Sequence, residues 1–272
     1  MRGHQNLKMF ISSKICFLEL EKTGISSIKK FLKNHIREGK ITRPHDYVTD
    51  EILNKKLFFL GSIRNPLDWY ISRWSYGCMM RSDDSLFRNF VKKRFNISRI
   101  NNIDGQYFKK IKYLKNQLFK NNTNLENLYS DPYNKDNFKK WLKELLTNKK
   151  NSPLAEHYFF SSLYLNFGYM TFRYLIMFTQ PNYRKKIYSE IKNYQNIIDF
   201  DKNYNFINKF VKVENLKYDL EVLIKELGID KTKEIEIVNP SKRKKDLDYY
   251  YDDESLEIVK KQDKFIFDKF NY

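Results

Sequence analysis

The chain has 272 residues, and its 51 lysines and arginines against 33 aspartates and glutamates give a formal net charge of +18. This length allows one large domain with its own core, and two cysteines are too few for a disulfide-held scaffold. The positive charge would attract nucleic acid, anionic membranes or polyanionic small molecules, so it excludes none of these partners. Residues 1–13 are polar and basic and no run of about eighteen apolar residues occurs, so we expect a cytoplasmic protein without a signal peptide or membrane anchor.

The first quarter of the chain combines an apolar strand, a tight turn and an amphipathic helix. The apolar run at residues 14–20 predicts a strand, and apolar residues at helical spacing predict a helix over residues 26–36. In the turn between them, Lys22 carries a positive charge and Gly24 permits a backbone conformation that other residues resist. The free N–H groups of the helix start point back at such a turn, which can therefore hold an anion.

A second strand-to-loop junction follows along the chain. A loop at residues 43–46 contains a proline, which disfavours helix in the residue before it. Residues 57–64 then predict a strand that ends at Arg64, and residues 68–76 predict a helix that contains Ser72.

The remainder of the chain continues the alternation of helices and strands. Residues 82–151 form a basic, helical region that we interpret as an insertion or lid, with its clearer helices at 109–119 and 137–146. After it we predict, in order, a strand at 174–179, a helix at 181–191, a strand at 205–213 and a helix at 216–227 that Gly228 ends. This alternation predicts a single α/β domain over residues 1–272, with a mostly parallel central sheet flanked by helices.

The two strand-to-loop junctions together resemble the carbohydrate-directed branch of the sulfotransferases that use 3′-phosphoadenosine 5′-phosphosulfate (PAPS). The first loop of that branch reads roughly Pro-Lys-Thr-Gly-Gly-Thr-Ser, and this chain matches it at Lys22, Thr23, Gly24 and Ser27. The second loop reads roughly Arg-Asn-Pro-x-x-Arg-x-x-Ser, and the chain matches it at Arg64, Asn65, Pro66 and Ser72. Both motifs follow an apolar strand and lie about forty residues apart, which makes the pair more specific than either motif alone.

The resemblance implies a P-loop-type α/β fold that transfers a sulfuryl group from PAPS to an acceptor hydroxyl, on a carbohydrate or a glycolipid. Residues 210–229 are similar to a family strand that ends in a glutamate, here Glu214, and is followed by a helix. The chain departs from the two motifs at Glu21, Ile25 and Tyr70. Because a carboxylate beside an anion site is unfavourable, we expect Glu21 to point to solvent or to pair with a lysine.

The resemblance also implies roles for individual residues. Lys22 would place a cation at the leaving oxygen of the departing nucleotide. Hydroxyl and backbone donors of the first loop would hold the 5′-phosphate, at Thr23, Gly24, Ser26 and Ser27, and the two serines can also cap the helix. The paired donors of an arginine and a serine hydroxyl would hold the 3′-phosphate, at Arg64 and Ser72. Two further basic residues either reach the nucleotide or form a solvated patch, at Lys242 and Arg243.

A base for the acceptor hydroxyl is the last requirement, and histidine suits it because its pKa lies near neutrality. In the carbohydrate branch a histidine between the two motifs often serves as this base, which favours His45. The second candidate is His157, which Glu156 could orient, and the carboxylates of Glu19 and Glu21 are further options. We expect no metal, because the histidines and cysteines are too few and too scattered for zinc spacing.

Three other interpretations stay open. A P-loop kinase would need the full Gly-x-x-x-x-Gly-Lys-Ser/Thr signature and a carboxylate for magnesium, and neither is evident. A non-catalytic binder of RNA or of an anionic membrane fits the charge, although the basic residues are spread along the chain. A relative that binds the nucleotide without activity would account for Glu21 and Ile25. For a cytoplasmic sulfotransferase that acts on a lipid-linked acceptor, the aromatic segment 158–178 would provide a peripheral contact with a membrane.

Overall fold

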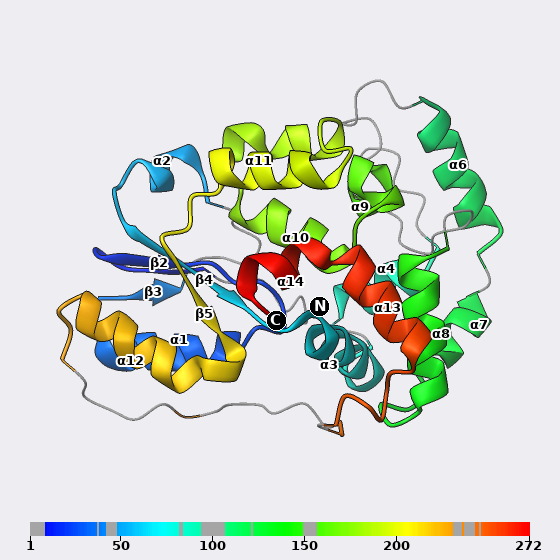
Figure 1. Cartoon of the computed structure of the whole chain (residues 1–272), viewed down its shortest axis with the longest axis horizontal. Helices are drawn as coiled ribbons and strands as arrows, with labels where there is room; N and C mark the ends of the chain where they lie inside the picture. Colours follow the sequence, from blue (N-terminus) through cyan, green and yellow to red (C-terminus); the bar gives the residue numbers. More distant parts are fainter. Residues whose placement is uncertain are drawn as a thin grey trace.

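A five-stranded sheet with helices on both faces organises the chain (Figure 1). The computed structural model describes residues 9–36, 38–41, 48–81, 84–93, 107–120, 122–148, 157–230, 236, 243–244 and 246–272. Within these ranges the strands are β1 (Phe10–Ile11), β2 (Ile15–Phe17), β3 (Lys40–Ile41), β4 (Phe58–Ile63) and β5 (Lys209–Lys212). Their order across the sheet is β3-β1-β2-β4-β5. The predicted α/β fold class is therefore confirmed.

Strands β2, β4 and β5 run parallel, and they correspond to three of the four strands that the sequence predicts. In this register Phe17 lies beside Leu60, and Ile63 lies beside Lys212. The carboxyl ends of the three strands therefore meet at one edge of the sheet. The two-residue strands β1 and β3 add an antiparallel pair on the far side of β2, and the sequence analysis did not predict them.

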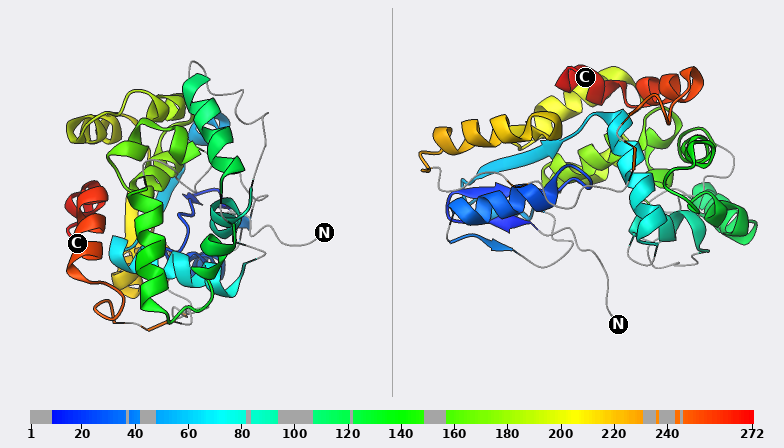
Figure 2. Two further views of the ribbon diagram at one scale, coloured as in Figure 1. Left: turned by 90° about the vertical axis from the view of Figure 1, so that its right-hand side faces the viewer. Right: turned by 90° about the horizontal axis from the view of Figure 1, so that it is seen from below.

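The helices are of two kinds, α-helices and 3₁₀ helices. The α-helices are α1 (Ile25–His35), α2 (Asp50–Leu53), α3 (Pro66–Met79), α4 (Ser85–Val91), α6 (Tyr107–Leu118), α7 (Asn122–Asn127), α8 (Lys135–Leu146), α9 (His157–Phe160), α10 (Tyr169–Phe178), α11 (Tyr194–Tyr204), α12 (Leu216–Glu226), α13 (Asp253–Gln262) and α14 (Lys264–Phe270). Three short 3₁₀ helices are η1 (Ser162–Leu165), η2 (Pro181–Tyr188) and η3 (Val213–Asn215). Figure 2 shows the strands toward one end of the molecule and helices α3 to α8 toward the other. Among the described residues, no helix combines the length and the apolar character needed to cross a bilayer.

Two hydrophobic cores lie on the two faces of the sheet, because side chains alternate along each strand. Ile15 and Phe17 of β2 belong to the smaller core, where they meet the buried sides of α1 and α12. Cys16, between them, belongs to the larger core with α3, α8 and α10. Helix α8 contributes Phe138 and Trp141 to this larger core, so this part of the predicted insertion belongs to the body of the domain.

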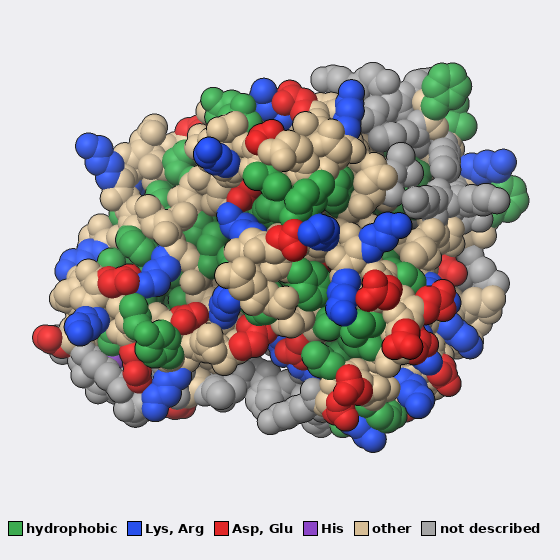
Figure 3. All heavy atoms as spheres, viewed as in Figure 1, with side chains coloured by type: hydrophobic (Ala, Val, Ile, Leu, Met, Phe, Trp, Pro, Cys, Tyr) green, Lys and Arg blue, Asp and Glu red, His purple; other side chains and the backbone are tan. Residues whose placement is uncertain are grey.

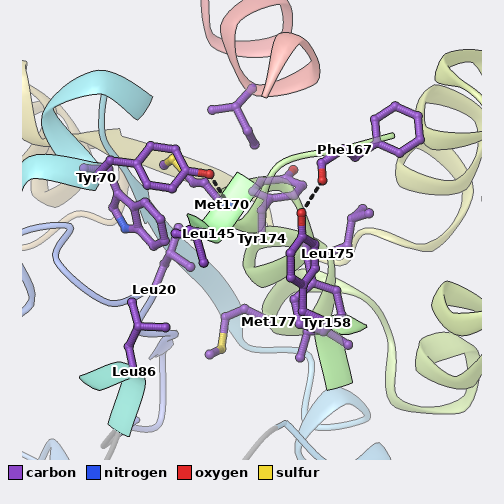
Figure 4. Packing of buried hydrophobic residues seen from close by; sticks show 14 of the residues in the cluster. Leu20, Tyr70, Leu86, Leu145, Tyr158, Phe167, Met170, Tyr174, Leu175 and Met177 are labelled. Atoms are coloured by element: carbon purple, nitrogen blue, oxygen red, sulfur yellow. Dashed lines mark hydrogen bonds between the residues drawn. The ribbon is translucent and has the colours of Figure 1, made fainter. Parts of the chain in front are cut away.

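The predicted strand at residues 174–179 is wrong, because residues 174–178 continue helix α10 and Thr179 only caps its end. Nearly all of its side chains are buried, including Met170, Tyr174 and Phe178, each with no exposed surface. A helix that is apolar on all sides loses the periodicity that distinguishes it from a buried strand. Figure 4 shows Met170 and Tyr174 within the larger core, where the hydroxyl of Tyr158 donates to the carbonyl of Phe167 at 2.5 Å.

A buried carboxylate joins three helices beside the sheet. Asp263, between α13 and α14, accepts from the Tyr70 hydroxyl at 2.6 Å, from the Thr171 N–H at 2.8 Å and from the Thr171 hydroxyl at 2.7 Å. These bonds satisfy a group that would otherwise be costly to bury. Gly168 passes so close that a Cβ on it would lie 2.1 Å from a carboxylate oxygen of Asp263.

We predict that Gly168→Ala destabilises the fold by about 3 kcal/mol, because the new methyl overlaps a carboxylate held by three hydrogen bonds. The measurement is urea unfolding followed by circular dichroism. Gly228→Ala is the control, since Gly228 has a φ of 61° with nothing within 4 Å of the added Cβ, so only backbone strain acts. That control should cost about 1 kcal/mol, and equal losses in the two variants would contradict the steric explanation.

Candidate functional site

The two loops that carry the motifs lie in direct contact at the carboxyl ends of β2 and β4. The guanidinium of Arg64 donates through Nη1 to the carbonyl oxygen of Lys22 at 3.1 Å. The indole of Trp69, in the first turn of α3, donates to the carbonyl of Glu21 at 2.6 Å. The structure therefore brings together the lysine and the arginine that the sequence singles out.

The first loop adopts a left-handed backbone at two positions. Gly24 has a φ of 75°, and Lys22 has a φ of 65°, which is unusual for a residue with a side chain. Helix α1 begins directly afterwards with Gly24 as its N-cap, so the prediction that Ser26 or Ser27 caps the helix is wrong. Without a side-chain cap, the first N–H groups of α1 face the loop as possible anion donors.

The side chains of this loop differ in their exposure. Thr23 is fully buried, and its hydroxyl donates to the carbonyl of Leu20 at 2.6 Å and lies 2.5 Å from the Ser62 hydroxyl. It therefore ties the loop to β4, and its hydroxyl already has partners. Ser27 is also buried, whereas Ser26 is exposed.

The ammonium group of Lys22 lies between the loop and helix α3. Its Nζ sits 3.2 Å from the centre of the Tyr76 ring, a cation–π contact. Ser72 is one helical turn before Tyr76, so it belongs to the face of α3 that looks toward this lysine, and it is buried. Burial, together with the positive charge of Arg73, lowers the pKa of Lys22 to about 7. A lysine in that state can gain a full charge when an anion binds beside it.

Arg64 and Arg243 share one carboxylate. Arg64 pairs with Asp68 through Nε and Nη2, and Arg243 reaches the other oxygen of Asp68 from the last part of the chain. The three side chains are 15%, 7% and 21% exposed for Arg64, Arg243 and Asp68, so solvent screens them only partly. Two guanidinium groups thus surround a single anionic group at the start of α3.

The second loop is braced from the end of the chain as well. Glu214, which follows β5, accepts from the N–H of Asn65 at 2.7 Å and from the Tyr272 hydroxyl at 3.1 Å. The side chain of Asn65 accepts from the N–H of Leu67 at 2.9 Å and so caps α3. The predicted glutamate at the end of a strand therefore holds the loop that begins with Arg64.

Glu21 pairs with an arginine, which corrects the expectation of a lysine partner or of solvent. Arg173 of α10 donates from Nε to one carboxylate oxygen of Glu21 at 3.3 Å and contacts the other through Nη2. Burial, the largest single influence, acts to raise the pKa of Glu21, but the charges of Arg173 and Arg73 and the hydrogen bond from Arg173 together hold this pKa below its ordinary value. A carboxylate held in that way is a poor general base, which weighs against Glu21 in that role.

A second arginine lies deeper beside the same loop. Arg73 of α3 is 5% exposed, and its Nη2 lies 3.2 Å from a carboxylate oxygen of Asp84. Its Nε is buried and finds no hydrogen-bond partner among the described residues. Because a buried cationic donor without an acceptor is costly, this atom marks a place where an anion would be stabilised.

The histidines leave the predicted base undecided. His45 lies outside the described residues, as does Lys242, and His157 begins α9 with a side chain that is likewise outside the description. Glu19, a further option, is buried and pairs with Lys29 at 3.0 Å. Among the described residues, no cluster of three or more histidine, cysteine or acidic side chains could hold a metal ion.

Sequence reasoning missed Asp68, Arg73, Tyr76 and Arg173. Arg173 gave a usable signal, because a lone charge inside an otherwise apolar segment needs a buried partner. Arg73 and Tyr76 share a helix with Ser72, but only the packing of α3 against the first loop assigns them to the site.

Comparison of the chain with protein families, with curated proteins and with solved structures finds no match.

We predict that breaking the ion pair between Glu21 and Arg173 lowers the free energy of unfolding, and that the effects of the two single substitutions are not additive. Arg173→Met leaves the Glu21 carboxylate half-buried without its counter-ion and should cost about 2 kcal/mol. Glu21→Gln should cost a similar amount, and the double variant should cost less than the sum by about 1 kcal/mol. Urea unfolding of the four proteins measures this coupling.

The control for this cycle is an exposed ion pair at the end of η2, in which Lys186 pairs with Glu190 at 3.3 Å. Lys186→Met should change the free energy of unfolding by less than about 0.5 kcal/mol, because solvent screens both charges. Strictly additive effects of Glu21→Gln and Arg173→Met would contradict the pairing.

Proposed function

We propose that this chain is a sulfotransferase that moves a sulfuryl group from PAPS to an acceptor hydroxyl on a carbohydrate or a glycolipid. The observation that carries the proposal is the contact between the two motif loops, in which Arg64 donates to the Lys22 carbonyl. Ligands of open α/β sheets bind at the carboxyl ends of parallel strands, and these two loops leave β2 and β4 at that edge.

The donor set around the first loop suits a dianionic group. Lys22, the uncapped start of α1 and the buried Nε of Arg73 offer positive charge and N–H donors within one region. In this proposal Lys22 offsets the charge that develops on the departing nucleotide, and the N–H groups of the loop and of α1 hold the 5′-phosphate. PAPS supplies the sulfuryl group, and the protein aligns and stabilises the groups that exchange it.

The two arginines at the start of α3 suit the second phosphate. Arg64 and Arg243 already enclose the carboxylate of Asp68, so in our proposal a 3′-phosphate replaces or joins this carboxylate. Arginine forks favour such an exchange, because they bind phosphate and carboxylate oxygens in the same paired geometry.

On the acceptor side, the proposed reaction needs a base that takes the proton of the hydroxyl. His45 remains our first candidate for the base and His157 our second, since Arg173 and Arg73 together lower the pKa of Glu21 and make it a poor one. A cytoplasmic location is part of the proposal, supported by the two free thiols of Cys16 and Cys78.

We predict that adenosine 3′,5′-bisphosphate binds and raises the melting temperature, and that ATP with magnesium does not. Lys22→Met should weaken binding of both the bisphosphate and AMP by about tenfold or more, because both carry the 5′-phosphate. Arg64→Met should weaken only the bisphosphate and leave AMP unchanged, because AMP lacks the 3′-phosphate. Isothermal titration calorimetry measures these affinities.

Lys225→Met is the matched control, since Lys225 lies in the last turn of α12 and should leave both affinities unchanged. Stabilisation by ATP with magnesium alone would favour a kinase and contradict the proposal. Tight RNA binding that is unaffected by Lys22→Met and Arg64→Met would favour a non-catalytic binder instead.

We also predict that bisphosphate binding weakens as the pH rises above about 7. The pKa of Lys22 is about 7 in the free protein, and a bound phosphate raises it, so binding takes up a proton between these two values. The affinity should then fall by up to about tenfold per pH unit above neutrality, until the bound pKa is reached. Lys22→Arg keeps its charge in this range and should flatten the dependence, so an equal slope in both proteins would overturn the assignment.

A further inference from the structure

Helix α6 and the residue directly after it carry a row of large apolar side chains on the outer side of the helix. The row consists of Phe108, Ile111, Leu118 and Phe119, which are 86%, 48%, 59% and 77% exposed. These four are half of the eight large hydrophobic side chains that the described residues leave exposed, and the other four are scattered over other elements. We call the four residues the α6 stripe. Figure 3 shows hydrophobic side chains protruding at the upper right edge, where Figure 1 places α6.

The stripe follows the geometry of one helix face. The spacing along this face is three or four residues, at Phe108, Ile111, Lys115 and Leu118. Phe119 continues the helical hydrogen bonding, because its N–H donates to the Lys115 carbonyl at 3.1 Å. The opposite side of α6 is fixed to the domain by Tyr113, which is buried against the Phe160 ring. The apolar row is therefore presented outward on an anchored helix.

Among the described residues, lysines accompany the stripe, with Lys115 exposed within the row. The sequence of α6 contains four lysines and no acidic residue, and Lys93 adds its ammonium group at the end of the helix, donating to the Leu118 carbonyl at 3.0 Å. Exposed aromatic and aliphatic side chains beside lysines are typical of helices that lie in the interface of an anionic bilayer. Pairing two copies through this surface would instead bring two lysine-rich helices together, and like charges repel.

We propose that the α6 stripe binds the surface of an anionic lipid bilayer, with its four apolar side chains inserted among the lipids and with Lys93 and Lys115 on the headgroups. Each lysine near such a surface adds to the attraction, and salt weakens it. This surface replaces the aromatic segment 158–178 as the membrane contact, because most of the described aromatic side chains of that segment are buried in the core, with Tyr158 and Phe159 at 3% and 4% exposure. The inference does not depend on the proposed sulfotransferase activity.

The test is co-sedimentation of the full chain with vesicles of phosphatidylcholine alone and of phosphatidylcholine mixed with phosphatidylglycerol. We expect binding to the mixed vesicles, and a decrease of binding as salt is added. Phe108→Ser/Phe119→Ser should lower the partition coefficient by about tenfold or more, because both side chains lose the apolar surface that they would insert. Tyr218→Ser is the matched control: Tyr218 is 69% exposed on α12, and its loss should leave the partition coefficient unchanged.

Lys115→Glu is a second variant that leaves the apolar row intact, and it should weaken binding to the mixed vesicles. Thermal melting of each variant verifies that it is folded. Equal binding of the wild type and the Phe108→Ser/Phe119→Ser variant would overturn the proposal, as would failure of the wild type to bind the mixed vesicles. Sedimentation velocity gives the remaining outcome: a wild-type dimer that the double variant dissociates would identify the stripe as a contact between copies and overturn the bilayer proposal.

Discussion

The parallel pairing of β2 with β4 is the constraint on which the rest of the site depends. Because Phe17 lies beside Leu60, both strands end at the same edge and release their loops side by side. Two cores bury the two faces of these strands, so a shift of one residue would exchange their buried faces. The register is therefore fixed by packing, and the contact from Arg64 to the Lys22 carbonyl follows from it.

The charged side chains at this edge of the sheet form ion pairs with residues of other helices. Glu21 of the first loop is neutralised by Arg173 from α10, and Arg73 of α3 is paired with Asp84 at the start of α4. Buried pairs of this kind add little net stability, because desolvation of the charges offsets their attraction. Perturbed charges gathered at one place are more typical of sites that bind or react than of scaffolding, and the lowered pKa of Lys22 fits that pattern.

The last third of the chain completes a site that begins in the first quarter. Glu214 holds the N–H of Asn65, and Arg243 shares Asp68 with Arg64. Asp263 fixes α3 against α10 through Tyr70 and the Thr171 backbone, although α13 and α14 follow them by many residues. The orientation of α3, and with it that of Arg73 and Tyr76, is therefore set by contacts across the whole domain.

The sequence by itself determined the α/β class, the three parallel strands and the loops that carry Lys22 and Arg64. Those features depend on local patterns, in which an apolar run, a glycine turn and a helical period are visible within a few residues. The tertiary structure decided the helical state of residues 174–178, the partner of Glu21 and the sharing of Asp68 by two arginines. It also decided that segment 158–178 is buried while the apolar row on α6 is exposed. Pairing and burial depend on residues far apart in the chain, so no local pattern can specify them.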